Sequence, residues 1–361
     1  MMTKVIANFL PQFHVIPENS KWWGEGYTDW VGVRQAKPQY GGHIQPRVPM
    51  NNNYYSLDNV DSLKWQAELA NKYGVYGFGI YHYWFSTDLK ILEKPAEILL
   101  SHSEININYM FIWDNTSWTR TWTRNGCKND SVNKSEVLAE FKYGTEVDWK
   151  RHFDYLLQFF LDDRYIKLDG KPVFAFFQPQ NNFKLQERMI VYWEKLAIDA
   201  GLPGIVCLSK DNAHGNHFEY RFRYSPFSPN NFWGGVKNKI NHIWANKRKK
   251  IRFADYDKQW KSILSDAKRA NDKTFLSGFV AFDDTPRRGR RARIVRGGSP
   301  EKFRKYFGEL LKISNEQNKE YAFVTAWNEW GEGAYLEPDE TNGYAYLEAL
   351  KSAIDECQVE K

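Results

Sequence analysis

Residues 58–85 read DNVDSLKWQAELANKYGVYGFGIYHYWF, a stretch with one helical pattern, one glycine turn and one apolar run. Asp58 or Asn59 can cap a helix that continues to Lys72, because the apolar residues between them recur on one face. Val75–Tyr81 is nearly continuous in apolar residues, as expected for a parallel strand that is covered on both faces. The stretch therefore predicts a helix that turns sharply into a buried strand.

The same pattern recurs along the whole chain. Eight apolar runs have strand length: Val5–Phe9, Val75–Tyr81, Asn108–Trp113, Pro172–Phe177, Gly204–Ser209, Tyr220–Tyr224, Thr274–Phe282 and Tyr321–Trp327. Further helical patterns separate most of these runs: Glu146–Arg164, Gln186–Ala200, Tyr256–Ala270, Pro300–Glu316 and Thr341–Glu356. The segment before the sixth run, around Ala213–His217, is too short for a full helix.

Eight strands that alternate with helices favour a closed (β/α)8 TIM barrel, formed by residues 1–361 as one domain. The alternative is an open doubly wound sheet. No GxGxxG or GxxxxGK[ST] motif follows any run, which weakens the nucleotide-binding form of that alternative. Helix-to-strand connections are short, whereas the strand-to-helix connections Pro11–Leu57, Asp114–Thr145 and Ser225–Asp255 are long. In a barrel, such long loops lie on the C-terminal face of the strands, where active sites are built.

The composition is that of a globular protein with an unusual number of aromatic residues. Of 361 residues, 42% are hydrophobic and 26% charged, and the mean hydropathy is −0.66, which excludes disorder, collagen-like repeats and a coiled coil. The net charge of +6 is a mild basic balance that does not require nucleic acid, and we expect no nucleic-acid partner. The 15 tryptophans exceed what we expect a core to need, and aromatic faces commonly hold sugar rings or bases.

The chain is typical of a protein from a reducing compartment. Its three cysteines, Cys127, Cys207 and Cys357, have neither zinc-site spacing nor a disulfide pattern. The first apolar run is interrupted by Asn8 and ends at Pro11, too short for the apolar core of a signal peptide. No stretch approaches the ~20 apolar residues of a membrane span. We therefore expect reduced thiols and a cytoplasmic location.

The last apolar run leads into residues 325–333, TAWNEWGEG, which contain two carboxylates three positions apart. On an extended strand Glu329 and Glu332 would point to opposite faces, but Gly331 permits a turn that brings both toward one cavity. Glycosidic cleavage needs two carboxylates that flank one bond, one as proton donor and the other as base or nucleophile. Apolar neighbours raise the pKa of one carboxyl, which keeps it protonated. We predict that both residues are catalytic, in preference to two unremarkable acids on a solvated loop.

Aromatic residues beside short polar side chains follow several other runs. Aromatic faces pack on the C–H faces of sugars, and Gln, His, Asn and Arg side chains bind sugar hydroxyls. A lone histidine such as His82 is equally well explained as a structural residue. The residues that we predict to bind substrate on this basis are Gln12, His14, Trp23, Tyr81, His82, Tyr83, Trp113, Asn115, Trp118, Arg120, Trp327, Asn328 and Trp330.

Two basic runs stand out in the predicted loops. One run lies in Phe282–Arg291, and from it we predict that Asp283 and Arg287 bind substrate. Arginines in such a position can hold a carboxylate, phosphate or sulfate group of a ligand. Pairing of Arg287 with Asp283 or Asp284 is the alternative. The basic run Lys247–Arg252 is explained most simply as a solvated charged surface. The functional alternative is that it attracts the protein to a membrane surface. His, Asp and Cys lack metal-ligand spacing, and neither HExxH nor GxSxG occurs, so we expect no metal and no cofactor.

These segments together resemble the glycosyltransferase WbsX-like family, which is related to family 99 glycoside hydrolases that act on α-mannosidic linkages through a (β/α)8 barrel. The resemblance runs from FLPQFH at 9–14 to LEPD at 336–339 and includes YHYWF at 81–85, DTPRRG at 284–289 and WNEW at 327–330. It implies a retaining mechanism, with Glu329 as base, Glu332 as general acid/base, and the substrate's own 2-hydroxyl as nucleophile through a 1,2-anhydro sugar. The last motif runs on to Tyr335, which we add to the substrate-binding residues.

One loop departs from the family pattern. Family members usually read WANENWTR where residues 113–120 here read WDNTSWTR. Thr116 therefore stands in place of the usual glutamate, and Asp114 appears two positions earlier. The departure concerns the substrate contacts of this loop and leaves the glutamate pair intact.

The sequence thus predicts a retaining, endo-acting glycoside hydrolase of a bacterial-type polysaccharide, and Arg120, Arg287 and Arg288 suggest that this glycan is acidic or phosphorylated. The first alternative is a glycosyltransferase in the assembly of a cell-surface polysaccharide, which the expected cytoplasmic location supports. The second alternative is a non-catalytic glycan-binding barrel, which would tolerate the loss of Glu329 and Glu332. Release of reducing ends, as opposed to consumption of a nucleotide sugar, separates hydrolysis from transfer.

Overall fold

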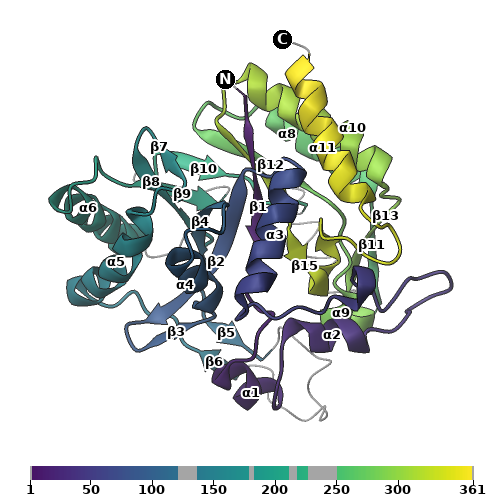
Figure 1. Ribbon diagram of the computed structural model, residues 1–361, viewed down its shortest axis with the longest axis horizontal. Coiled ribbons are helices and arrows are strands. Elements are labelled where there is room, and N and C mark those ends of the chain that lie inside the picture. Colours follow the sequence, from purple (N-terminus) through teal and green to yellow (C-terminus); the bar gives the residue numbers. More distant parts are fainter. Residues whose placement is uncertain (1, 121–135, 179–182, 211–217, 227–249, 360–361) are drawn as a thin grey trace.

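Eight parallel strands form the centre of the molecule (Figure 1). The computed structural model describes residues 2–120, 136–178, 183–210, 218–226 and 250–359. The central strands are β1 (Lys4–Phe9), β2 (Gly77–Ser86), β4 (Asn108–Trp113), β8 (Lys171–Phe176), β9 (Val206–Lys210), β10 (Tyr220–Phe222), β12 (Thr274–Phe279) and β14 (Tyr321–Thr325). Most of their residues are buried, because helices cover the outside of the sheet and side chains fill its inside.

These strands close into a barrel. They pair in parallel in the order in which they occur along the chain, and β14 pairs back onto β1 with Val5 opposite Ala322. β1 pairs on its other side with β2, where Ile6 lies opposite Gly77. Each of the eight strands therefore has two neighbours. The predicted (β/α)8 barrel is confirmed, and the alternative of an open sheet is wrong.

Helices cover the outside of the barrel (Figure 1). They are α3 (Val60–Lys72), α4 (Lys94–Ser101), α5 (Glu146–Phe160), α6 (Phe183–Asp199), α8 (Tyr256–Ala267), α10 (Pro300–Glu316) and α11 (Ala345–Val359). Asn59 and not Asp58 caps α3, because the Asn59 side chain accepts a hydrogen bond from the backbone N–H of Asp61. None of the helices in the described part of the chain combines the length and apolar character that crossing a membrane requires.

Element ends differ from the sequence prediction in several places. β2 begins two residues later than predicted and continues to Ser86, because the aromatic residues after Tyr81 favour a strand and pair with β4 and with the short strand β3 (Leu89–Ile91). At the other end of the barrel, β7 (Lys167–Leu168) forms a hairpin with β8. The segment Ala213–His217 lies outside the described residues, as do Cys127 and the first three residues of the basic run that begins at Lys247.

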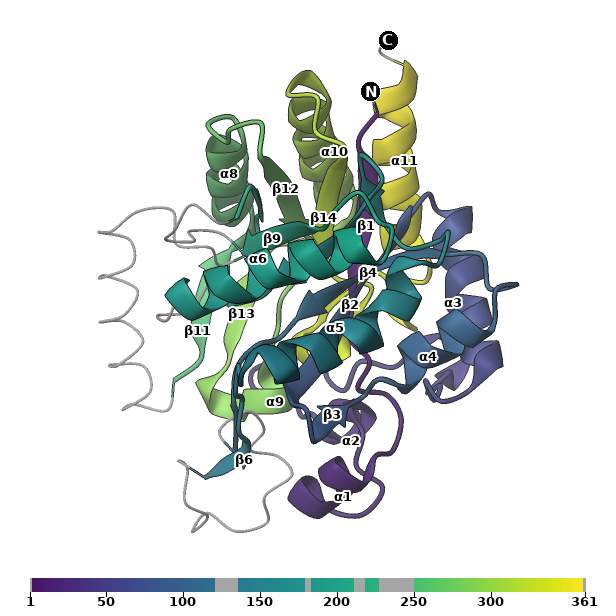
Figure 2. The ribbon, with the colours of Figure 1, turned by 90° about the vertical axis from the view of Figure 1, so that its left-hand side faces the viewer.

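The long connections add smaller elements, many of which gather at one end of the barrel. In Figure 2, α1, α2, α9 and β6 lie at the bottom, whereas both chain termini lie at the top. These additions follow the C-terminal ends of β1, β4, β10, β12 and β14, as the loop lengths predict. They are α1 (Pro17–Trp23), α2 (Asp29–Gln35), η1 (Met50–Asn52), β5 (Trp118–Thr119), β6 (Val137–Ala139), β11 (Arg252–Asp255), α9 (Thr285–Arg288), η2 (Gly289–Arg291), β13 (Arg293–Arg296), β15 (Asn328–Glu329), η3 (Trp330–Glu332) and β16 (Ala334–Tyr335).

The core takes up many of the tryptophans that the composition suggested as sugar contacts. The largest fully buried side chains include Trp113, Trp149, Trp193, Trp260, Trp327 and Trp330. Three of these tryptophans, Trp113, Trp149 and Trp193, donate their indole N–H groups to backbone carbonyls, at 2.8 to 2.9 Å. The expectation that a core has no need of so many tryptophans was therefore wrong.

Candidate active site

Glu329 and Glu332 lie on a tight hairpin that follows the last barrel strand. β15 and β16 pair antiparallel, with Glu329 opposite Ala334, and the short helix η3 forms the turn between them. Gly333 ends this turn in the left-handed region, at a φ of 55°, which residues with a side chain rarely adopt. The hairpin replaces a continuing strand and directs both carboxylates toward one arginine.

Arg287 bridges the two glutamates. Its Nη1 lies 2.7 Å from Glu332 Oε1, and its Nη2 lies 3.1 Å from Glu329 Oε2. The same Nη2 lies 3.3 Å from Asp29 Oδ2. Arg287, Asp29 and Glu329 are buried, whereas Glu332 keeps a quarter of its side chain exposed. One guanidinium therefore holds three carboxylates together at the end of the barrel.

Asp29 was missed as a site residue by the sequence analysis. It begins α2, and its backbone N–H donates to the carbonyl of Gln12, just after β1, at 3.0 Å. A weak signal was present, because Asp29 is an acid between the aromatic residues Tyr27 and Trp30 in a long loop. Its partner Arg287 is 258 positions away along the chain, and no local pattern predicts that contact.

Burial and charge set the protonation of this cluster. Burial raises the pKa of Glu329, Arg287 opposes that rise, and the charges of Glu332 and Asp29 add to it. Burial lowers the pKa of Arg287, but the three carboxylates outweigh it and hold that pKa well above its ordinary value. Arg287 is therefore charged at every physiological pH, and Glu329 is a stronger base than an exposed glutamate once it is ionised.

A pocket opens beside this cluster. Asp29 and Arg287 form part of its wall, and the other lining residues are Gln12, Trp23, Tyr27, Trp118, Thr119 and Leu138. Four of the predicted substrate-binding residues therefore lie together: Gln12, Trp23, Trp118 and Arg287. Aromatic walls with a few polar groups are typical of a sugar-binding pocket.

Three neighbouring residues of β2 were predicted to bind substrate, but they do not all point the same way. Tyr81 and Tyr83 point to one face of the strand and His82 to the other. The hydroxyl of Tyr81 lies 2.8 Å from that of Tyr224, which the sequence analysis missed, and the hydroxyl of Tyr83 accepts from Gln12 Nε2 at 3.4 Å. His82 faces the other side, where its Nε2 lies 2.8 Å from Nε2 of His152 on α5. Successive residues of a strand point to opposite faces, so the prediction that His82 binds substrate beside the glutamates is corrected to a structural role.

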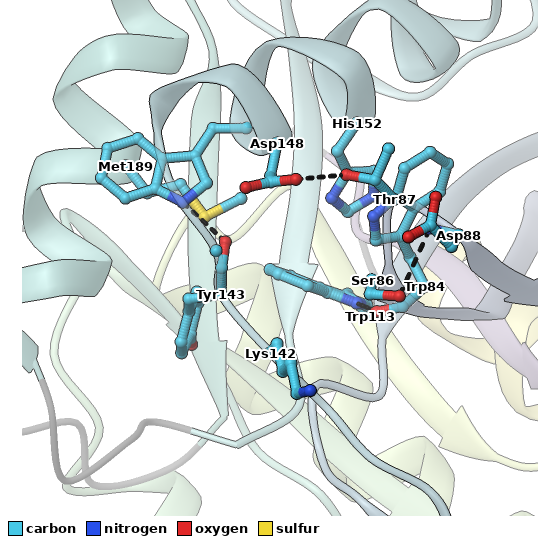
Figure 3. Close-up of a pocket in the computed structure, with 12 residues that line it drawn as sticks. Trp84, Ser86, Thr87, Asp88, Trp113, Lys142, Tyr143, Asp148, His152 and Met189 are labelled. Atoms are coloured by element: carbon cyan, nitrogen blue, oxygen red, sulfur yellow. Dashed lines mark hydrogen bonds between the residues drawn. The ribbon is translucent and has the colours of Figure 1, made fainter.

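Trp113 of β4 lies opposite His82 and points, like it, toward the helices outside the barrel. It lines a pocket other than the one beside the glutamates. Figure 3 shows Trp113, Trp84 and His152 around this pocket, together with Asp148 of α5. Hydrogen bonds from Thr87 and Thr145 lower the pKa of Asp148 below its ordinary value. Neither Glu329 nor Glu332 lines this pocket, so Trp113 lies apart from the glutamate pair and not beside it as predicted.

Several other predicted residues hold the framework of the site and do not line its pocket. Asn328 exchanges two hydrogen bonds with the backbone of Leu10, at 2.7 and 3.0 Å, and so fixes the glutamate hairpin to the end of β1. Asn115 makes the same kind of exchange with the backbone of Gln178, after β8. Trp330 donates its indole N–H to Glu337, and burial raises the pKa of this glutamate to about 7. His14 and Trp327 are likewise buried.

Tyr335 and Asp283 form contacts on the other side of the hairpin. The ring of Tyr335 stacks on Trp330 with 3.7 Å between centroids, and its hydroxyl donates to Asp339. Asp283 accepts a hydrogen bond from Gln45 at 3.0 Å and lies 2.8 Å from Nε2 of His43. The alternative pairing of Arg287 with Asp283 or Asp284 is therefore wrong, because other groups engage both carboxylates and Arg287 binds the glutamates.

The loop that departs from the family pattern reaches the rim of the pocket. The guanidinium of Arg120 lies 5.6 Å from the centre of the Trp23 ring and pairs with Glu136 at 2.6 Å. Asp114 is buried, and it accepts a hydrogen bond from the hydroxyl of Thr116 at 2.8 Å. Burial raises the pKa of Asp114. Thr116, which stands where family members usually have a glutamate, therefore holds the neighbouring Asp114 in place.

Gly331 is expected to tolerate no side chain. A Cβ at this position would lie 2.6 Å from both Arg287 Nε and Asp29 Oδ2. Cβ atoms in proteins essentially never come within 3.0 Å of such atoms. Gly331→Ala should therefore displace Arg287, reduce stability by about 1–3 kcal/mol and lower turnover, although both glutamates remain. Gly308→Ala in α10 is the matched control, because its Cβ would meet nothing closer than 3.8 Å. Equal melting temperatures of the two variants would contradict this account of Arg287.

Comparison with known sequences identifies relatives over nearly the whole chain. The family model described as Glycosyltransferase WbsX matches residues 5–350. The WxcX proteins of two Xanthomonas campestris pv. campestris strains, B100 and ATCC 33913, are each 28% identical over 366 aligned residues, which cover 97% of this chain. The chain spans about half the length of these curated relatives, 49% in each case.

Comparison with solved structures finds the same barrel. Two structures of a GH99 endo-α-mannosidase from Bacteroides thetaiotaomicron align with TM-scores of 0.54 and 0.59, at 14% and 12% identity, over 98% and 99% of this chain and 97% of each solved chain. A structure described as a glycoside hydrolase-like protein aligns with a TM-score of 0.60 at 11% identity, over 98% of this chain and 94% of its own. At these identities the likeness concerns the fold alone. By the family match over residues 5–350, the chain belongs to the glycosyltransferase WbsX family.

Proposed function

We propose that the protein is a retaining, endo-acting glycoside hydrolase that uses the 2-hydroxyl of its substrate as the nucleophile. The observation that carries the proposal is the pair of Glu329 and Glu332, bridged by Arg287 beside an aromatic pocket at the end of the barrel. Family membership and the barrel support a glycan-active enzyme. Hydrolysis and the 2-hydroxyl route are what the resemblance to family 99 glycoside hydrolases implies, and Glu329 and Glu332 supply the two carboxylates that this route uses.

Glu329 is proposed as the base of the first step. Its carboxylate takes the proton of the 2-hydroxyl, and that oxygen attacks the anomeric carbon to form a 1,2-anhydro sugar. The burial that raises the pKa of Glu329 makes it a better proton acceptor, and the bond from Arg287 holds that pKa below the value that burial alone would give. No carboxylate nucleophile close to the anomeric carbon is needed on this route.

Glu332 is proposed as the general acid and base. It protonates the departing glycosidic oxygen, then removes a proton from the water that opens the anhydro sugar, while Glu329 returns its proton to the 2-oxygen. Its side chain is 25% exposed, so the water that opens the anhydro sugar can reach the Glu332 carboxylate from solvent. The neighbouring aromatic residues Trp23 and Trp118 would hold the sugar ring by its C–H face.

Transfer is the second candidate function, because the family carries the name of a glycosyltransferase. In that reaction the hydroxyl of an acceptor sugar replaces water in the second step, and the glutamates keep their roles. A reaction that needs an acceptor and leaves the number of reducing ends constant would favour transfer over hydrolysis.

The 2-hydroxyl mechanism makes a sharp prediction about substrates. On a glycan identified by array screening, the enzyme should release reducing ends, and NMR of the first products should show retained anomeric configuration. The matching 2-deoxy glycan should bind but release product at least about 10²-fold more slowly, because the attacking oxygen is gone. A 2-fluoro sugar covalently attached to a carboxylate such as Asp114 would overturn the route and leave the two glutamates as binding residues.

A further inference from the structure

The tertiary structure brings together the two basic runs that lie far apart in the sequence. β11 and β13 lie side by side (Figure 2) and pair in parallel. In this pairing Arg252, from the first run, lies opposite Arg293, which comes just after the second run. Arg288 reaches the same place from α9, because its Nε lies 3.1 Å from Asp284 Oδ2 and the backbone N–H of Arg293 donates to Asp284 Oδ1. Three arginines thus gather around the single carboxylate of Asp284.

These arginines repel one another. Burial and the charge of Arg288 lower the pKa of Arg252, and burial and the charges of Arg252 and Arg288 lower that of Arg293 to about 10. Nε of Arg252 is buried and has no hydrogen-bond partner. Like charges on facing strand positions destabilise a sheet, and Asp284 and Glu332 offset only part of the repulsion among these arginines. The three guanidinium groups exceed Asp284 by two positive charges.

The arginine cluster borders the proposed catalytic pair. The backbone N–H of Asp283 donates to the carbonyl of Glu332 at 2.6 Å, which places the neighbouring Asp284 next to the glutamate hairpin. The charge of Glu332 acts on both Asp284 and Arg293. Arg288 keeps half of its side chain exposed, so a ligand can reach the cluster from solvent.

We propose that Arg252, Arg288 and Arg293 bind a phosphate group that the glycan ligand carries next to Glu332. The proposal deepens the proposed function, on which it rests for the position of the reacting bond. A group with two negative charges offsets the repulsion among three guanidinium groups more fully than a single carboxylate does. Guanidinium groups bind phosphate oxygens through paired, charge-assisted hydrogen bonds, and three of them can surround one phosphate.

Calorimetric titration with inorganic phosphate, pyrophosphate and glucuronate tests the proposal without any need for turnover. We expect phosphate or pyrophosphate to bind at least about 10-fold more tightly than glucuronate, and binding to weaken between ~50 and 500 mM NaCl. The double variant Arg252→Gln/Arg293→Gln should weaken phosphate binding by at least about 10-fold. Arg296→Gln is the matched control, because it removes one charge from β13 where the side chain stacks on Phe253 and Tyr40. Arg288→Gln, at a half-exposed site, keeps the test open if the double variant does not fold.

The outcomes separate this proposal from the proposed function. Phosphate binding that persists in Glu329→Gln supports the subsite even if no hydrolysis is ever found. Pyrophosphate preferred over phosphate points to the diphosphate of an activated sugar, and equal affinity points to a phosphate within the glycan. Absence of binding, tighter binding of glucuronate, or binding that survives both the double variant and Arg288→Gln would overturn the subsite. The arginines would then serve only to offset the three carboxylates around Arg287.

Discussion

Glu329→Gln and Glu332→Gln should each lower turnover on a confirmed substrate by about 10²-fold or more. That is the usual effect of losing a positioned acid or base, and glutamine preserves the shape of the side chain. The matched control is Glu348→Gln on the exposed side of α11, which should leave turnover unchanged. Near-normal turnover in either of the first two variants would defeat the proposed mechanism and favour a non-catalytic glycan-binding barrel.

Glu329→Gln should also fold at least as stably as the parent protein at pH 7. Glu329 is buried, and burial raises its pKa above the value in the unfolded chain. A group shifted in this direction stabilises the fold when it is protonated, and that contribution is lost as pH rises through the folded-state pKa. The parent protein should therefore lose stability relative to the variant between acidic and neutral pH, which melting curves over that range measure.

Arg287→Met should be the most destabilising of the single substitutions considered. It leaves Asp29 and Glu329 buried without their shared cation, and breaking a buried ion pair in this way costs about 3–5 kcal/mol. Without Arg287, Glu329 is harder to ionise in the folded state, so its pKa rises further. The loss of stability should therefore be larger at pH 7 than at pH 5, and denaturant unfolding at both pH values measures it.

The same substitution should shift the pH dependence of activity. Arg287 holds down the pKa of Glu329, so its removal should move the acidic limb of the rate profile to higher pH. Arg288→Met is the control for stability, because the Arg288 side chain that pairs with Asp284 is half-exposed and should contribute only about 1 kcal/mol. If Arg287→Met costs no more than Arg288→Met, Arg287 does not hold the carboxylates together as described.

The barrel was predictable because its signals are local. Each strand is a short apolar run, each helix has a periodic face, and Pro300–Glu316 was predicted to the residue. Closure followed from the count of eight runs and from the position of the long loops. The ends of β2 were predicted less well, because aromatic residues after Tyr81 fit both a strand and the loop of a binding site.

The candidate site was predictable only where its residues are neighbours in the chain. The spacing of Glu329 and Glu332 and the turn at Gly331 are local features, and they identified the pair. The direction in which the aromatic side chains of a strand point was not predictable from the sequence. A shift of one position along a strand turns a side chain from the barrel interior to the layer of helices outside it. Tyr81 and Tyr83 therefore lie inside, and His82 lies against His152.

By itself, the sequence determined the alternation of strands and helices, the end of the barrel that carries the long loops, and the two glutamates near that end. Only the tertiary structure decided which cation holds those glutamates, that Asp29 joins them, and that Arg252 meets Arg293. The physical reason is that these contacts join residues from 41 to 258 positions apart. Their partners are selected by the closure of the barrel and by the burial of charge, which no local pattern of residues encodes.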